Sequence, residues 1–195
     1  MLLQEKLIDK KIFLASQSPR RQELLKRLGI DFVVVKIESD ESFPEELNRE
    51  EITEFISENK ANACGELNPG EILITADTLV WLNNRVFGKP QDAQEAFDMI
   101  AEMSDATHEV FTSVTLKSNE KILTFSETTE VTFDKFSEEE INFYIEHFKP
   151  FDKAGAYGIQ DWLGYAKISR INGCYYNVMG LPLHHLYKVL LLEEF

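Results

Sequence analysis

The sequence predicts an α/β fold in a single domain spanning residues 1–195. Short apolar runs at 12–15, 32–35 and 72–76 have the length and composition of buried strands. Stretches with apolar residues at helical spacing follow these runs, and turn-forming residues separate the two kinds of segment. This alternation predicts a sheet covered by helices.

Capping residues place the first two long helices. Ser18 is expected to accept a backbone N–H as the N-cap of a helix that starts with Pro19 and ends at Gly29 in a left-handed conformation. Asn48 begins a capping box for the next helix, which runs to about residue 66. The residues predicted on the buried side of that helix are Ile52, Phe55, Ile56 and Ala63.

The same patterns predict the remaining elements. A hairpin turn is expected at Asn83-Asn84, and Ser137 begins a capping box for a helix that ends before Pro150. The inward side of this helix is predicted to hold Ile141, Tyr144, Ile145 and Phe148. Further predictions are a helix at 92–103, strands at 109–116 and 121–132, a hairpin of 168–171 with 174–178, and a last helix opened by Pro182.

The composition excludes several kinds of protein. The chain has 44% hydrophobic residues and can bury a core, but its net charge of -14 argues against general binding of nucleic acid or an anionic membrane. Cys64 and Cys174 are not a close pair, so neither a disulfide framework nor a cysteine-rich zinc site is indicated. No stretch has the pattern of a signal peptide or a membrane span, and we expect a cytoplasmic protein.

Two adjacent arginines, Arg20 and Arg21, lie in the first turn of the helix predicted at 19–28, where the helix dipole disfavours cations. A phosphate would offset them, because it can accept hydrogen bonds from backbone N–H groups, from the Ser16 and Ser18 hydroxyls and from a guanidinium. The alternative is a surface helix that happens to begin with two arginines. An oxyanion site is the simpler explanation.

Carboxylates follow the predicted strands. Glu41 lies in an acidic stretch after the second strand, where a solvated loop and a ligand for a divalent cation are both open. Asp77 lies between two apolar segments and needs a metal, a lysine or a water as partner, because an unpaired buried charge is very costly. Lys60 lies near the end of its helix, where a ligand role and an interaction with the helix dipole are equally open.

Two glycine-containing loops add further cations and an amide. Lys89 follows a glycine, but its neighbours lack the P-loop pattern, so this lysine would meet phosphate only as a point charge. In the loop 152–160, Lys153 supplies charge and Gln160 supplies an amide that both donates and accepts, as reading a nucleobase edge requires. Of the four histidines, only His108 has the context of a site residue. Cations for phosphates, carboxylates for Mg²⁺ and water, and an amide for a base together describe the hydrolysis of a nucleotide.

These segments resemble, in order along almost the whole chain, the motifs of the Maf family of nucleoside triphosphate pyrophosphatases. The matching segments are Ser16–Leu25, Asp40-Glu41, Lys60-Ala61, Ala76–Thr78, Gly88–Pro90, Thr107–Thr112, Asp152–Gln160 and Val178–Pro182. Two departures stand out. Asp105 lies where the family pattern usually has glycine, and the loop after Gln160 is one residue longer than in some relatives.

The resemblance implies an elongated mixed β-sheet flanked by helices, in two lobes around a cleft, the Maf/ITPase-like fold. It implies cleavage between the α and β phosphates to give a nucleoside monophosphate and pyrophosphate, with Mg²⁺ or Mn²⁺ as cofactor and a homodimer as the assembly. By analogy, Asp77 accepts the proton of the attacking water and holds metal together with Glu41. Lys60 and Lys89 neutralise phosphate charge by the same analogy.

The resemblance also indicates a branch of the family. Arg20, Thr78 and Gln160 are similar to the members that act on dTTP and UTP, whereas the branch acting on 7-methyl-GTP carries an aromatic residue, a glutamine and a glutamate there. Housecleaning of canonical or modified pyrimidine triphosphates is the role this implies. Two alternatives stay open, a non-catalytic nucleotide-sensing regulator of septum formation and a nucleotidyltransferase with a second acceptor substrate.

Overall fold

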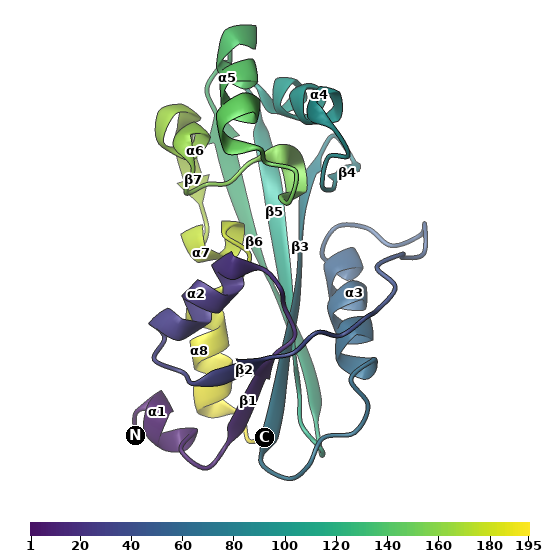
Figure 1. The fold of residues 1–195 in the computed structure, drawn as a ribbon, viewed down its shortest axis with the longest axis vertical. Helices are drawn as coiled ribbons and strands as arrows, with labels where there is room; N and C mark the ends of the chain where they lie inside the picture. Colours follow the sequence, from purple (N-terminus) through teal and green to yellow (C-terminus); the bar gives the residue numbers. More distant parts are fainter. The chain divides into compact units, whose positions relative to one another are not determined.

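Seven strands form one mixed sheet in the computed structural model, which describes all 195 residues (Figure 1). The strand order is β2-β1-β3-β5-β6-β7, and β4 pairs with β3. β1 lies parallel to β2 and β3, whereas the β3–β4 and β6–β7 pairs are antiparallel, so the predicted mixed α/β sheet is confirmed. The strands are β1 (Lys11–Leu14), β2 (Phe32–Val34), β3 (Glu71–Leu82), β4 (Arg85–Phe87), β5 (Thr107–Lys117), β6 (Ile122–Phe133) and β7 (Ile168–Asn172).

The chain divides into two units that share three strands. Unit 1 consists of Met1–Asp77, Thr112–Glu127 and Gly180–Phe195, and unit 2 consists of Thr78–Phe111 and Thr128–Met179. β3, β5 and β6 each contribute residues to both units. None of the helices in either unit has both the length and the apolar character needed to cross a membrane.

Unit 1 carries helices on both faces of its strands. On β6, the side chains of Thr124 and Ser126 are hydrogen bonded on the face that α3 covers, whereas Phe125 and Glu127 contact His185 of α8. Successive side chains of a strand point to opposite faces, so α3 and α8 cover opposite faces, as Figure 1 also shows. The helices of unit 1 are α1 (Leu3–Lys6), α2 (Pro19–Arg27), α3 (Glu50–Asn62) and α8 (Leu183–Leu192).

Unit 2 has its own apolar core. Buried side chains from β5, β6, α4 and α5 pack together there, among them Ile100, Phe133, Ile141 and Tyr144. Ala156, Tyr157 and Ile159 of the glycine-containing loop belong to the same cluster, so this loop is anchored to the core. The helices of unit 2 are α4 (Ala93–Met103), α5 (Glu138–Phe148), α6 (Trp162–Lys167), α7 (Tyr175–Val178) and the 3₁₀ turn η1 (Ala154–Ala156).

The structure confirms two turns and one cap that rest on local chemistry. Gly29 follows α2 with φ = +69°, and Asn83 and Asn84 form the β3–β4 turn with φ = +52° and +58°. Ser137 makes both hydrogen bonds of a capping box with Glu140 at the start of α5. Such signals act over a few residues. The predicted N-cap at Asn48 is wrong, because Arg49 is the N-cap residue of α3, although the Asn48 N–H donates to Glu51 Oε2 at 3.0 Å.

The predicted strand at 174–178 is wrong, because these residues form α7 (Tyr175–Val178) after a turn at Gly173. The Thr129 hydroxyl accepts a hydrogen bond from the Cys174 N–H at 3.0 Å and donates one to the Cys174 carbonyl at 3.2 Å. Those side-chain bonds occupy the backbone groups that a strand ladder would use. β7 pairs with β6 instead of forming a hairpin with 174–178.

Two predicted buried positions are exposed. Ala63 lies just beyond α3, which ends at Asn62 rather than near residue 66. Phe148, at the end of α5, is 38% exposed. Thr53 and Ser57 are fully buried on α3 instead, so this helix presents hydroxyl groups to the sheet alongside Ile52 and Ile56. Pro182 stands at the N-cap of α8, one residue before the predicted position.

Candidate active site

The hydrogen bonds at the start of α2 differ from those predicted. Ser18 is the N-cap residue, but its side chain accepts no capping hydrogen bond. The Ser16 hydroxyl accepts one from the Ser18 backbone N–H at 3.2 Å, and the Ser16 carbonyl accepts one from Gln22 Nε2 at 3.2 Å. Ser16 rather than Ser18 therefore orders the entry to the helix.

Arg21 is bound to backbone carbonyl groups within unit 1. Its Nε donates to the Gly180 carbonyl at 2.7 Å and its Nη1 to the Ala76 carbonyl at 2.8 Å. Burial lowers the pKa of the Arg21 guanidinium, and the negative charges of Asp77 and Glu41 act in the opposite direction. Arg21 is one of the two arginines whose position predicted a bound anion. The carbonyl groups and carboxylates around it already compensate its positive charge. Arg20, the other cation, is partly exposed.

Lys60 joins the two carboxylates that the sequence singled out. Its Nζ lies 2.8 Å from Asp77 Oδ1 and 2.9 Å from Glu41 Oε1. The Lys60 and Asp77 side chains are 13% and 17% exposed, whereas Glu41 is 56% exposed. Of the partners considered for Asp77, the lysine is therefore present, and it links α3, β3 and the acidic segment after β2.

The carboxylates of Glu41 and Asp77 suit one kind of metal. The chain has no group of three His, Cys, Asp or Glu side chains that could hold an ion. Two carboxylates within 3 Å of one ammonium supply oxygen ligands of the kind that Mg²⁺ uses when substrate phosphates and waters complete its coordination. The donor set thus fits a cation shared with a phosphorylated substrate.

Two predicted cationic loops of unit 2 are joined through their backbones. The Gly155 N–H donates to the Gly88 carbonyl at 3.0 Å, which fixes η1 beside the residue that precedes Lys89. Gly155 has φ = +66°, and a Cβ at this position would lie 2.9 Å from Val80 Cγ2, so only glycine fits without strain. Lys89 is exposed.

The side chain of Lys153 is largely covered and has acidic neighbours. Its Nζ lies 2.8 Å from Asp152 Oδ1 and 3.7 Å from Asp161 Oδ2, and 13% of the side chain is exposed. A phosphate that binds Lys153 would therefore compete with these carboxylates. The ammonium group is ordered in advance as a point charge.

Gln160 lies in a turn that a tyrosine holds at both ends. The Asp161 N–H donates to the Gly158 carbonyl at 3.0 Å, which closes the turn around Gln160. Tyr144 Oη accepts from the Gly158 N–H and donates to Asp161 Oδ2, each at 3.0 Å. The Oε1 atom of Gln160 is buried and has no hydrogen-bond partner in the structure. A buried amide oxygen in this state needs a donor, so it fits a ligand that carries an N–H group.

From its spacing in the sequence, Tyr144 is predicted only as a packing residue on the inward face of α5. Its hydroxyl is the group that reaches the Gln160 turn, and burial raises the pKa of Tyr144 so that the phenol stays protonated. A buried tyrosine usually has a hydrogen-bond partner, which is the signal that points to such a role. The sequence offers no means of naming that partner.

His108 is a packing residue. Its Nε2 is hydrogen bonded to Tyr157 Oη at 2.7 Å, and its ring packs against Phe133 and Tyr157. Burial lowers the pKa of His108 to about 3, so the ring is neutral at physiological pH. Thr78 follows Asp77 in β3 and is partly buried.

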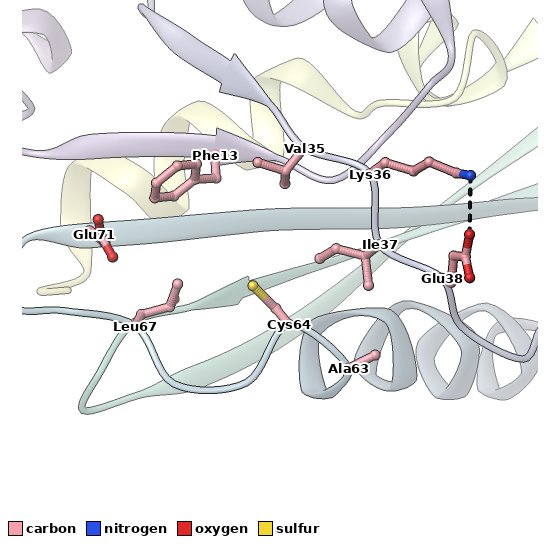
Figure 2. A pocket seen from close by; sticks show the side chains of 9 residues that line it. All are labelled: Phe13, Val35, Lys36, Ile37, Glu38, Ala63, Cys64, Leu67 and Glu71. Carbon is pink, nitrogen blue, oxygen red and sulfur yellow. Dashed lines mark hydrogen bonds and ion pairs between the residues drawn. The ribbon is translucent and has the colours of Figure 1, made fainter.

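A pocket of about 360 Å³ in unit 1 contains none of the predicted site residues. Figure 2 shows that its wall combines apolar side chains with an ion pair, in which Lys36 Nζ lies 3.1 Å from Glu38 Oε1. The lining residues are Phe13, Val35, Lys36, Ile37, Glu38, Ala63, Cys64, Leu67 and Glu71. The paired cations and carboxylates described above, rather than this pocket, carry the candidate chemistry.

The departure at Asp105 has a backbone explanation. Asp105 has φ = +56°, in the left-handed region that glycine enters without strain and that aspartate tolerates better than most residues. The substitution therefore keeps the local conformation.

The fold is similar to that of a solved HAM1 protein from Coxiella burnetii. The similarity covers 94% of this chain and 100% of that chain, with a TM-score of 0.52 and 16% sequence identity. At this level of identity the similarity establishes the fold alone. It places the mixed sheet and its helices in a known α/β architecture.

The chain belongs to the family described as Maf-like protein, which it matches over residues 11–193. A dTTP/UTP pyrophosphatase of Flavobacterium johnsoniae is 50% identical over 190 residues, which is 97% of this chain and 98% of the relative. A protein of the same description from Bacteroides thetaiotaomicron is 48% identical over 183 residues, 92% of this chain and 95% of the relative. The predicted family is thus confirmed.

Proposed function

We propose that this protein hydrolyses dTTP and UTP to the nucleoside monophosphate and pyrophosphate with the help of Mg²⁺ or Mn²⁺. The observation that carries the proposal is the cluster in which Lys60 binds both Asp77 and Glu41 within 3 Å. Relatives described as dTTP/UTP pyrophosphatases, 50% and 48% identical, support it. Modified pyrimidine triphosphates belong to the same proposed substrate class.

Asp77 is the proposed base for the attacking water. Lys60 donates to Asp77 Oδ1 and so fixes the orientation of the carboxylate, which a base in phosphoryl chemistry needs before substrate arrives. Glu41 and Asp77 are the proposed metal ligands. A bound divalent cation would supply charge neutralisation at the phosphate oxygens.

Cationic and hydroxyl groups are proposed to bind the phosphates. Each either donates hydrogen bonds or carries positive charge, and both properties stabilise the charge that develops on phosphoryl oxygens. Arg21 has two donors engaged with backbone carbonyls, so its proposed contribution is mainly its charge. The proposed phosphate ligands are Ser16, Ser18, Arg21, Lys60, Lys89 and Lys153.

Gln160 is proposed to select the base, together with Arg20 and Thr78. Uracil and thymine both present an N3–H donor beside a carbonyl acceptor, and an amide side chain can match this pair with its Oε1 and its NH₂ group. The buried Oε1 of Gln160, which lacks a hydrogen-bond partner, supports this assignment. We further propose that the protein is cytoplasmic and that it forms a homodimer. Light scattering of the purified protein would test the homodimer.

The test is product analysis with purified protein, Mg²⁺ or Mn²⁺, and a panel of canonical and modified triphosphates. Pyrophosphate should be released from dTTP and UTP with water as the sole acceptor, and Asp77→Asn should abolish release while nucleotide binding persists. The exposed-residue variant Lys36→Met serves as the matched control in unit 1. Orthophosphate as the first product, or binding without turnover by the unmodified protein, would reject the proposal.

A further inference from the structure

Two neighbouring hydrogen bonds connect α3 to β3. The Thr75 hydroxyl donates to the Ser57 carbonyl at 2.7 Å, and Lys60 Nζ donates to Asp77 Oδ1 at 2.8 Å. Thr75 and Asp77 are two residues apart in a strand, so their side chains share a face. Ser57 and Lys60 are three residues apart in a helix, so they also lie on a common face. Both contacts therefore connect the same helix face to the same strand face.

The Thr75 contact is completely buried. Thr75 and Ser57 both have no exposed surface, so their hydrogen bond is not exchanged for one with bulk water. The Ser57 carbonyl lies inside α3 and is also the normal acceptor for a backbone N–H four residues later. The threonine hydroxyl adds a second donor to this carbonyl from outside the helix, which ties the helix backbone itself to β3.

Hydrogen bonds between further hydroxyl groups connect α3 to β5. Ser57 Oγ is hydrogen bonded to Thr115 Oγ1 at 2.9 Å, and Thr53 Oγ1 to Ser113 Oγ at 2.6 Å. Hydrogen bonds depend on direction and distance, whereas apolar contacts allow a helix to slide along a sheet. The buried hydroxyls therefore fix where α3 lies along the strands. Among them, only the Thr75 bond comes from β3, the strand that carries Asp77.

We infer that Thr75 is a positioning residue, whose hydroxyl holds α3 at the place on β3 where Lys60 meets Asp77. This inference rests on the proposed role of Asp77 as the base. Lys60 also binds Glu41 in the segment after β2, but that contact does not connect α3 to β3. The register of α3 on β3 is then what keeps the ammonium and the Asp77 carboxylate in contact.

Thr75→Val is the direct test, because valine keeps the shape of threonine and removes the hydroxyl. We expect kcat for dTTP to fall about 10-fold, since small misplacements of catalytic groups are costly, while KM changes less than about 2-fold. Thr75→Ser restores the donor and should recover kcat to within about 2-fold of the unmodified protein. Thr107→Val is the matched control, because it removes a threonine–threonine hydroxyl hydrogen bond, the one to Thr132 Oγ1 at 2.8 Å, that reaches neither α3 nor its partners on β3 and β5.

A double-variant cycle separates positioning from simple loss of stability. Thr75→Val should have no further effect on kcat once Lys60→Met is present, because the contact that it positions is already gone. The same fold-loss in both backgrounds would overturn the inference, as would an unchanged kcat in Thr75→Val. If the valine variant does not fold, Thr75→Ala carries the same comparison.

Crystal structures of the same variants keep the inference testable even if the proposed function fails. In Thr75→Val, the Lys60 Nζ to Asp77 Oδ1 distance should lengthen by about 0.5 Å or more, the tolerance within which catalytic groups are held. A distance that stays at the present 2.8 Å would overturn the positioning role whatever the protein hydrolyses. Absence of turnover by the unmodified protein would reject only the proposed function.

Discussion

The two units prepare their candidate functional groups in different ways. In unit 1 the charged side chains are paired with one another, with Lys60 bound to Asp77 and Glu41. In unit 2 the backbone around Gln160 is held by Tyr144, while the buried Oε1 of Gln160 lacks a hydrogen-bond partner. A partly buried charge without a partner would cost much free energy of folding, whereas one neutral amide oxygen without a partner costs less. The Gln160 oxygen therefore stays unpaired before a ligand binds.

This difference predicts how each group would meet a ligand. In unit 1, a triphosphate and its cation would have to replace interactions that already exist, so binding there exchanges partners. In unit 2, a base would add a hydrogen bond to a group that has none. Variants of Lys60, Asp77 or Glu41 should therefore change the rate of the chemical step, and variants of the Gln160 turn should change the choice of substrate.

The largest expected effect comes from Lys60→Met, which leaves the carboxylates of Asp77 and Glu41 close together without their shared cation. We expect kcat for dTTP to fall about 100-fold or more, the usual loss when one electrostatic donor is removed from a reacting centre. Steady-state measurement of pyrophosphate release checks this. Lys36→Met, which removes an exposed lysine from an ion pair elsewhere in unit 1, should leave kcat unchanged.

A loss of less than about 3-fold in Lys60→Met would break the contrast between the units, because the paired charges of unit 1 would then serve only the fold. Thermal unfolding of the variant distinguishes the two cases. A catalytic role lowers kcat at temperatures where the variant is fully folded.

The next effect concerns the neutral buried groups of unit 2. Burial holds the pKa of His108 at about 3, below the value of about 6.5 expected in the unfolded chain. Between these two values the unfolded chain binds a proton that the folded chain does not, so the free energy of unfolding falls as the pH falls below 6.5. From pH 7 to pH 5, His108 should lower it by about 2 kcal/mol.

Denaturant unfolding at both pH values checks this prediction in the unmodified protein and in His108→Gln. The variant should lose about 2 kcal/mol less than the unmodified protein over this interval, whatever its own stability at pH 7. His184→Gln, on the exposed side of α8, is the control and should follow the unmodified protein. Equal pH dependence in all three proteins would contradict the burial of a neutral His108.

Sequence patterns predicted the parts of the molecule that local chemistry determines. The glycine after α2, the paired asparagines after β3 and the capping box of α5 each need only neighbouring residues, and each is confirmed. Lys60 and Asp77 were both recognised as site candidates, but their contact joins residues 17 positions apart on different elements. No periodicity encodes such a contact, so the structure was needed to pair them.

Predictions failed where tertiary contacts replaced local preferences. The stretch 174–178 has the composition of a strand, yet Thr129 takes the backbone groups of Cys174 and a helical turn follows. The burial of the Thr53 and Ser57 hydroxyls was not predicted, because polar residues on a helix normally face solvent. Their partners are hydroxyls of β5 and carbonyl groups within α3 itself, which together satisfy the buried hydroxyls. The carbonyl acceptors of Arg21 were not predicted either, because Ala76 and Gly180 are far from it in the sequence.

Tyr144→Phe has the smallest expected effect. It tests most directly whether the Gln160 turn governs base preference rather than rate. Phenylalanine keeps the packing of α5 but removes the hydroxyl that bonds the Gly158 N–H and the Asp161 carboxylate on either side of Gln160. A net hydrogen bond is worth about 1 kcal/mol, so the preference for UTP over CTP, measured as the ratio of kcat/KM values, should fall about 5-fold. The value of kcat for UTP should change little, because the variant leaves the cluster of Lys60, Asp77 and Glu41 unaltered. Tyr165→Phe, which removes an exposed hydroxyl of the same unit, should leave the ratio unchanged. A Tyr144→Phe variant that loses kcat and keeps its base preference would place the tyrosine with the rate-determining groups and erase the proposed distinction between the units.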